Sequence, residues 1–144
     1  MKDPYAQYRK SQVENASREE LLLKLYEAAI GSVKQAREKW AEENARAREK
    51  LIRALEIVYE LDSTLDRENE EGKEFVEQME SLYEYLEQEL TAVNLRGEVE
   101  RLADVQEVLE TLYQGWREAV EQVQAQSASD PAASGEPAGV PHSV

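Results

Sequence analysis

The chain has 144 residues and a formal net charge of −14, from 17 Lys and Arg against 31 Asp and Glu. This length suits one domain with a substantial core, and such an acidic surface repels phosphate backbones, which argues against nucleic acid or an anionic membrane as a partner. The absence of cysteine excludes disulfides and thiolate metal sites, and no apolar run is long enough for a membrane span or a signal peptide. We therefore expect a cytoplasmic protein without membrane insertion.

The composition predicts an all-α fold. Helix formers such as Glu, Ala, Leu, Gln, Lys and Arg dominate, and no segment shows the alternation of a strand. Four helices are expected, at residues 18–41, 45–66, 73–94 and 98–124. Short turns between long helices place successive helices antiparallel, so the sequence predicts an elongated antiparallel four-helix bundle over residues 17–126.

The first sixteen residues form an N-terminal leader. Pro4 fits the first position of a short helical turn, and the few apolar side chains are Tyr5, Tyr8 and Val13. The leader is either a frayed terminus or a lid whose aromatic rings dock into a groove on the bundle.

The first helix is expected to begin at a capping box. Ser17 and Glu20 have the spacing for reciprocal hydrogen bonds to each other's backbone N–H groups. Four leucines then cover more of the circumference than one buried face needs, which predicts more than one neighbouring helix. We expect this stretch, residues 17–26, to be scaffold and not binding surface.

Core rows with spacings of three and four follow along each helix. In the first helix they are Leu22, Tyr26, Ala29, Val33, Ala36 and Trp40; in the second, Leu51, Leu55, Val58, Leu61 and Leu65; in the third, Phe75, Met79, Leu82, Leu86 and Val93; in the fourth, Leu102, Val105, Leu109, Leu112, Trp116 and Val123. Asn44 is a candidate N-cap and Gly97 a helix stop. Gly115, inside the fourth helix, predicts a close contact with another helix.

A second apolar row lies beside the core row on two of the helices. Its members are Ile52 and Tyr59 on the second helix and Val76, Tyr83 and Leu90 on the third. Three explanations are open: a core wider than two rows, a homodimer face, or a groove that receives an amphipathic helix.

No residue pattern predicts catalysis. The only histidine, His142, lies in a tail from Ser127 onward that is rich in Ser, Pro, Ala and Gly and is expected to be disordered. A Gly-rich phosphate loop, a nucleophile elbow and a Ser/His/Asp set are all missing from the sequence. We expect neither an enzyme, nor a cofactor, nor a bound metal ion.

Several separated motifs together resemble the flagellar secretion chaperone FliS family over roughly residues 5–123. They are the leader Tyr5…Tyr8, then Val13-Glu14-Asn15-Ala16-Ser17, Glu20-Leu21, Leu25-Tyr26-Glu27, Ala54-x-x-Ile57-Val58-x-Glu60-Leu61, Ser63-x-Leu65-Asp66, Leu82-Tyr83-Glu84-Tyr85-Leu86, Ala92-x-Asn94 and Trp116.

The resemblance implies a cytoplasmic export chaperone that binds the C-terminal segment of flagellin. Such a protein prevents premature filament polymerisation and delivers flagellin to the flagellar type III export apparatus, whose export-gate components are further candidate partners. It also implies a leader that occupies part of the client site, so the lid would be Tyr5, Tyr8 and Val13. The client groove is predicted at Ile52, Tyr59, Val76, Tyr83 and Leu90, on a monomer or weak homodimer. The alternative is a generic helical adaptor or dimeric coiled-coil scaffold without a flagellar role.

Overall fold

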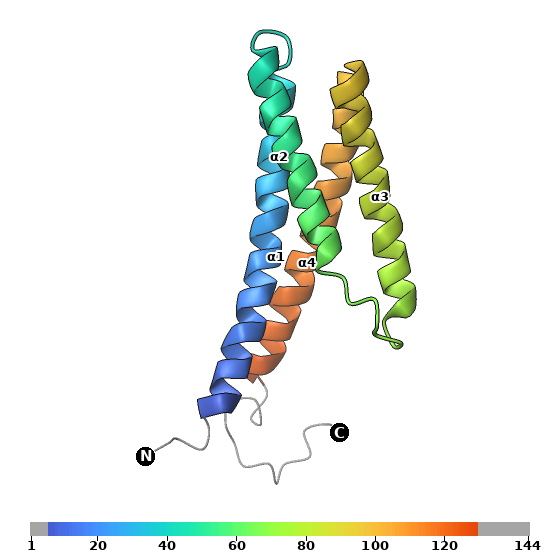
Figure 1. The fold of residues 1–144 in the computed structure, drawn as a ribbon. Helices are drawn as coiled ribbons and strands as arrows, with labels where there is room; N and C mark the ends of the chain where they lie inside the picture. The colour runs from blue at the N-terminus through green and yellow to red at the C-terminus, as the bar shows by residue number, and fades with distance from the viewer. Residues whose placement is uncertain (1–5, 130–144) are drawn as a thin grey trace.

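The computed structural model describes residues 6–129, and the side chains of residues 18–126. Over this range the chain is helical and contains no strand, and its helices run alternately up and down one bundle (Figure 1). The elements are α1 (Ala6–Lys39), α2 (Asn44–Ser63), α3 (Lys73–Arg96), the short 3-10 helix η1 (Val99–Arg101) and α4 (Leu102–Ser129). The predicted all-α fold of four helices packed together is confirmed.

The first helix begins earlier than predicted. α1 is continuous from Ala6, so Ser17 lies inside the helix and does not cap it. Residues 6–16 include Ala, Gln, Arg, Lys and Glu, which favour helix, and contain no Gly or Pro to end it. A capping-box pattern is compatible with a helix interior, and here helix propensity on its N-terminal side prevails.

The core runs along the centre of the bundle, where α1 packs against α2 and α4, and α3 packs against α2 and α4. Every helix contributes a row at spacings of three and four. The fully buried large side chains are Tyr26, Tyr83, Leu51, Ile57, Leu61, Leu86, Leu90, Leu102, Leu109, Val33, Val58 and Val93. Burying such side chains contributes about 1.5–3 kcal/mol each before chain entropy is subtracted, so packing and not propensity holds the bundle together.

On α3 the core face differs from the predicted one. The buried residues are Val76, Met79, Tyr83, Leu86, Leu90 and Val93, an unbroken series of spacings of three and four. Phe75, placed in the core row by the sequence, is 46% exposed, and Leu82 only packs against the edge of the core. Apolar residues adjacent in sequence, such as Phe75 and Val76, offer two overlapping rows, and the neighbouring helices decide which one faces inward. On α4, likewise, Val120 is buried and Val123 is exposed.

Helix ends agree with the predicted signals in part. Gly97 ends α3 with a positive φ of 72°, and its N–H donates to the carbonyl of Val93, as the stop signal predicts. Asn44 is the first residue of α2 and not its N-cap; its side chain instead donates to the carbonyl of Trp40. The close contact expected at Gly115 is wrong, because a Cβ placed there would meet nothing within 4 Å.

The two halves of the bundle differ in length. α1 and α4 continue side by side beyond the end of α2, and residues 64–72 connect α2 to α3 near this end (Figure 1). α4 runs to Ser129, past its predicted end near Gln124. The rest of the predicted tail, with His142, lies outside the residues that the structure describes.

Candidate functional site

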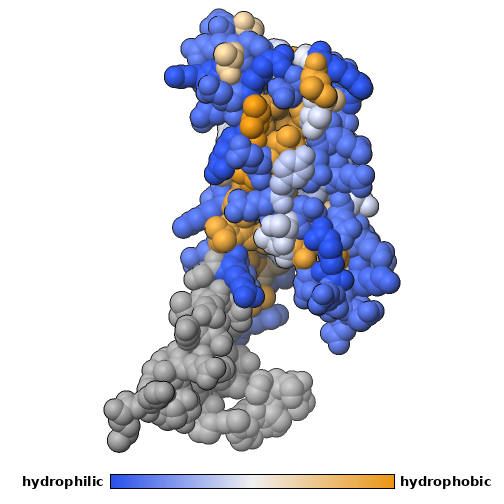
Figure 2. Space-filling model, in the orientation of Figure 1, coloured by the Kyte–Doolittle hydropathy of each residue, from blue (hydrophilic) through white to orange (hydrophobic). Residues whose placement is uncertain are grey.

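An apolar groove of about 530 Å³ opens where α2 ends and the other elements continue. Figure 2 shows a lengthwise band of apolar side chains on this face, with hydrophilic residues on both sides. α1, residues 64–72, the start of α3 and α4 form the groove. Its lining residues are Arg18, Glu19, Leu21, Leu22, Leu25, Thr64, Leu65, Asp66, Asn69, Gly72, Phe75, Val76, Tyr83 and Trp116.

The floor of the groove rests on a pair of buried tyrosines. The hydroxyl oxygens of Tyr26 on α1 and Tyr83 on α3 lie 2.6 Å apart, so one buried hydroxyl donates a hydrogen bond to the other. Burial raises the pKa of Tyr26, and burial together with the adjacent Tyr26 hydroxyl raises the pKa of Tyr83. Both phenols are therefore neutral at physiological pH and fix the floor by packing and hydrogen bonding.

A contact between two aromatic rings connects the α3 wall of the groove to the α4 wall. Phe75 on α3 and Trp116 on α4 meet edge to face, with ring centroids 5.8 Å apart and an interplanar angle of 80°. Phe75 is 46% exposed, and Leu21 on the α1 side is 54% exposed. Large apolar side chains thus remain in contact with water on both sides of the opening, which is the surface that a partner would gain most by covering.

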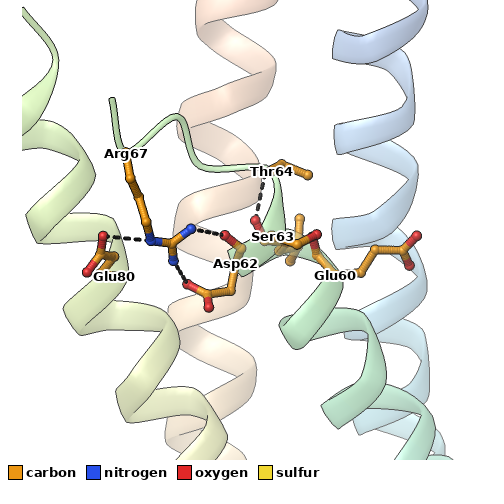
Figure 3. A network of polar contacts seen from close by, with 7 residues as sticks. Glu60, Asp62, Ser63, Thr64, Arg67 and Glu80 are labelled. Carbon is orange, nitrogen blue, oxygen red and sulfur yellow. Dashed lines mark hydrogen bonds and ion pairs between the residues drawn. The ribbon is translucent and has the colours of Figure 1, made fainter. Parts of the chain in front are cut away.

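Residues 64–72 form the fourth wall, and Arg67 holds them in place (Figure 3). Its guanidinium donates to the carbonyl of Asp62 at 3.2 Å and to the carboxylate of Asp62 at 2.9 Å, at the end of α2. Its Nε lies 3.0 Å from the Glu80 carboxylate on α3. Arg67 therefore connects the wall to both neighbouring helices.

Hydrogen bonds between residues close in sequence shape the rest of this wall. The Asp66 carboxylate accepts from the N–H of Glu68, and the Asn69 side-chain oxygen accepts from the N–H groups of Glu71 and Gly72. These local turns satisfy backbone donors that no helix supplies with a partner. The segment lines the groove with Leu65 while its charged side chains remain exposed.

The five predicted groove residues do not form one surface. Val76 and Tyr83 line the groove, although both are buried and belong to its floor. Leu90 lies in the core, 1% exposed. Ile52 and Tyr59 are about half exposed, and Tyr59 borders a separate shallow depression beside Leu95. For the α3 row, the wider-core explanation therefore accounts for the burial.

The predicted lid lies mostly beyond what the structure describes. Tyr5 is outside the described residues, and Tyr8 and Val13 belong to the part of α1 whose side chains are not described. The lid stays a prediction.

Sequence reasoning missed most of the groove walls. Leu21, Leu22 and Leu25 were assigned to scaffold, whereas all three line the groove, and Leu25 is at the same time part of the core. The excess of leucine around α1 was the available signal, since the extra leucines serve the groove. Leu65, Phe75 and Trp116 were assigned to core rows, and nothing in a single sequence shows that their neighbours leave them partly open.

Other kinds of site find no support in the part of the chain that the structure describes. No three His, Cys, Asp or Glu side chains there are arranged to hold a metal ion. None of the helices described is both long and apolar enough to cross a membrane.

An antiparallel helical bundle with an apolar groove at one end defines a protein-binding module. The model of the family described as flagellar protein FliS matches residues 1–123, so the chain belongs to the FliS family of flagellar secretion chaperones and is not an enzyme. The chain is also similar to the flagellar secretion chaperone FliS of Bacillus subtilis (strain 168). The two are 27% identical over 122 residues, which cover 84% of this chain and 89% of the relative.

Proposed function

We propose that this chain is a cytoplasmic export chaperone that binds the C-terminal segment of flagellin in the groove between α1, residues 64–72, α3 and α4. Binding there prevents premature polymerisation and presents flagellin to the flagellar type III export apparatus. The single observation that carries the proposal is an apolar groove with half-exposed Phe75 and Leu21 on a chain of the FliS family.

The shape of the groove suits a helical segment better than a small molecule. It is bounded by three helices and a loop and is open to solvent, and its apolar lining comes from α1, α3, α4 and Leu65. A volume of about 530 Å³ accommodates a few apolar side chains of a helix, the number that one face presents at i, i+3, i+4 and i+7.

Covering the client's apolar face explains the chaperone activity. A client segment that is disordered as a monomer and helical when assembled would form its helix against the groove. The face used for assembly is then buried, and the acidic surface of the chain keeps the complex soluble.

The direct test compares two charge insertions at apolar residues of similar exposure. Phe75→Glu places a carboxylate on the wall of the groove, whereas Val123→Glu places one on α4, where Val123 is 51% exposed and does not line the groove. Titration with a flagellin C-terminal peptide should show that Phe75→Glu lowers the affinity about 30-fold or more, which is the effect expected at a binding hot spot. Val123→Glu should bind as the unmodified chain does. Equal affinities for the two variants would contradict this groove.

The lid and the exposed row on α2 are part of the proposal. An occupied groove lowers apparent affinity by the fraction of open molecules, so removing residues 1–12 should tighten peptide binding. A folded truncated chain that binds no tighter would eliminate the lid. Ile52→Glu provides the corresponding test of the α2 row, and it should weaken binding only if flagellin extends beyond the groove.

The proposed partners are flagellin and, as candidates, export-gate components, with the chain acting as a monomer or weak homodimer. Light scattering of the free chain would measure its oligomeric state.

A further inference from the structure

The rim of the groove is asymmetric in charge. Residues 66–77, which include the loop wall and the start of α3, contain six acidic side chains and two basic ones. On the opposite wall, residues 18–27 of α1 contain three acidic and two basic side chains, of which Glu19 and Arg18 line the groove. Of the acidic side chains of residues 66–77, Asp66 lines the groove and the others lie beside it in the sequence; we call residues 66–77 the acidic strap.

Contacts within the strap leave its negative charge largely uncompensated. Of its two cations, Arg67 is already engaged by Asp62 and Glu80, which lie outside the strap. Asp66, Glu68, Glu70 and Glu71 are all exposed, and no ion pair is found to them among the described side chains.

Carboxylates also crowd the neighbouring surface between α2 and α3. Burial, with Asp62 and Glu84 nearby, raises the pKa of Glu87. Arg67 is the cation that reaches this interface through Asp62 and Glu80. Because Arg67 is paired with both of these carboxylates, it does not neutralise the acidic side chains of the strap.

We propose that the groove selects helical segments that carry Lys or Arg along the flank of the apolar stripe that faces the acidic strap. The inference rests on the proposed function, since it specifies the chemistry of the segment that the groove binds. The apolar stripe would provide most of the affinity. The basic flank would favour one orientation and disfavour segments with acidic flanks, because like charges would then face each other.

The test uses two model amphipathic helices with the same Leu and Phe stripe. One carries Lys along its flanks and the other carries Glu, and each is titrated into the full chain by calorimetry. In about 0.1 M salt the Lys peptide should bind about tenfold tighter than the Glu peptide. In about 1 M salt, where screening is nearly complete, the two affinities should become nearly equal.

A matched pair of variants separates a local effect from the net charge of the chain. Glu70→Gln with Glu71→Gln removes two charges from the strap, whereas Glu42→Gln with Glu49→Gln removes two exposed charges at the opposite end of the bundle. The strap variant should reduce the ratio of the affinities for the Lys and Glu peptides about twofold to threefold, and the control variant should leave this ratio unchanged.

Three results would overturn the inference: equal affinities for the two peptides, equal narrowing by both variants, or no binding of either peptide. A flagellin C-terminal peptide titrated in parallel tests the proposed function separately. If it binds while the two model peptides bind equally, the groove remains the proposed flagellin site and the preference for basic flanks is contradicted. If it does not bind, the proposed function fails.

Discussion

The two ends of the bundle differ in how their large apolar side chains are packed. At the closed end, the Arg48 guanidinium lies over the Trp40 ring, 4.9 Å from its centroid, and donates to the backbone and side-chain oxygens of Asn94. Gly97 turns the chain beside the same ring. At the open end, Phe75 and Leu21 remain about half exposed around a groove.

The difference shows where stability and binding are located. At the closed end, Arg48 of α2 contacts Trp40, which directly follows α1, and donates hydrogen bonds to Asn44 of α2 and Asn94 of α3. The open end leaves apolar side chains exposed around a groove, whereas Leu95 near the closed end is exposed beside a shallow depression only. Exposed apolar area in the groove reduces the stability of the free chain, and covering it contributes to the affinity for a partner. Variants at the two ends should therefore separate the free energy of unfolding from the affinity for a client.

The largest effect is expected at the floor of the groove. Tyr83→Glu would place a carboxylate at a position that is 1% exposed and facing the Tyr26 hydroxyl. We expect it to unfold the chain or to cost about 4 kcal/mol or more, because a buried charge without a cation is strongly disfavoured. Chemical denaturation followed by circular dichroism measures this. A folded variant of unchanged stability that fails to bind the peptide would instead place Tyr83 on the client surface.

At the closed end, Arg48→Ala removes the contact with Trp40 and the hydrogen bonds to Asn94. The expected loss is about 2 kcal/mol in the free energy of unfolding, with unchanged affinity for the flagellin peptide. Arg53→Ala is the control, because among the described side chains Arg53 makes only an exposed pair with Glu56, and its loss should change stability by less than about 0.5 kcal/mol. A large loss of affinity in Arg48→Ala would mean that the ends are not independent.

The tyrosine pair predicts an alkaline limit to stability. Because the folded-state pKa values of Tyr26 and Tyr83 are raised, their contribution is fully present below the unfolded pKa of about 10 and is lost as pH rises above it. Each tyrosine steepens the decline by up to about 1.4 kcal/mol per pH unit. The double variant Tyr26→Phe with Tyr83→Phe should be nearly as stable at neutral pH, since both partners are removed together, and should decline less steeply. Parallel pH profiles for the two proteins would argue against the buried pair.

The smallest effect is expected at Gly115, whose added methyl group would meet no atom within 4 Å. Gly115→Ala should raise the free energy of unfolding by about 0.5–1 kcal/mol through helix propensity and leave peptide binding unchanged. A destabilised variant would show that another segment of the chain approaches this surface of α4.

Sequence patterns predicted the fold far better than the groove. The predicted helices at residues 45–66 and 73–94 correspond to α2 and α3, although α2 ends three residues earlier than predicted, and Gly97 ends α3 as its position predicts. The sequence predicts Tyr83 in the second row with Val76 and Leu90, whereas in the structure it is buried and its hydroxyl partner, Tyr26, lies 57 positions away in the sequence. Such long-range pairings are invisible to local periodicity.

The groove could not be predicted because it depends on where helices end relative to one another. Leu65, Phe75 and Trp116 have ordinary core spacing, and they line an open groove only because α2 stops at Ser63 while α1 and α4 continue. The same reason explains why Leu22 and Leu25 on α1 contribute to both the groove and the core, whereas Leu21 remains exposed.

The two tryptophans of the chain allow the most direct test, since Trp40 lies at the closed end and Trp116 lines the groove. Trp40→Phe leaves Trp116 as the only indole, and Trp116→Phe leaves Trp40. On titration with a tryptophan-free flagellin C-terminal peptide, the emission of Trp116 should shift to shorter wavelength as water leaves the groove, while that of Trp40 should not change. A shift of Trp40 alone, or binding without any change at Trp116, would contradict the assignment of the groove as the client site.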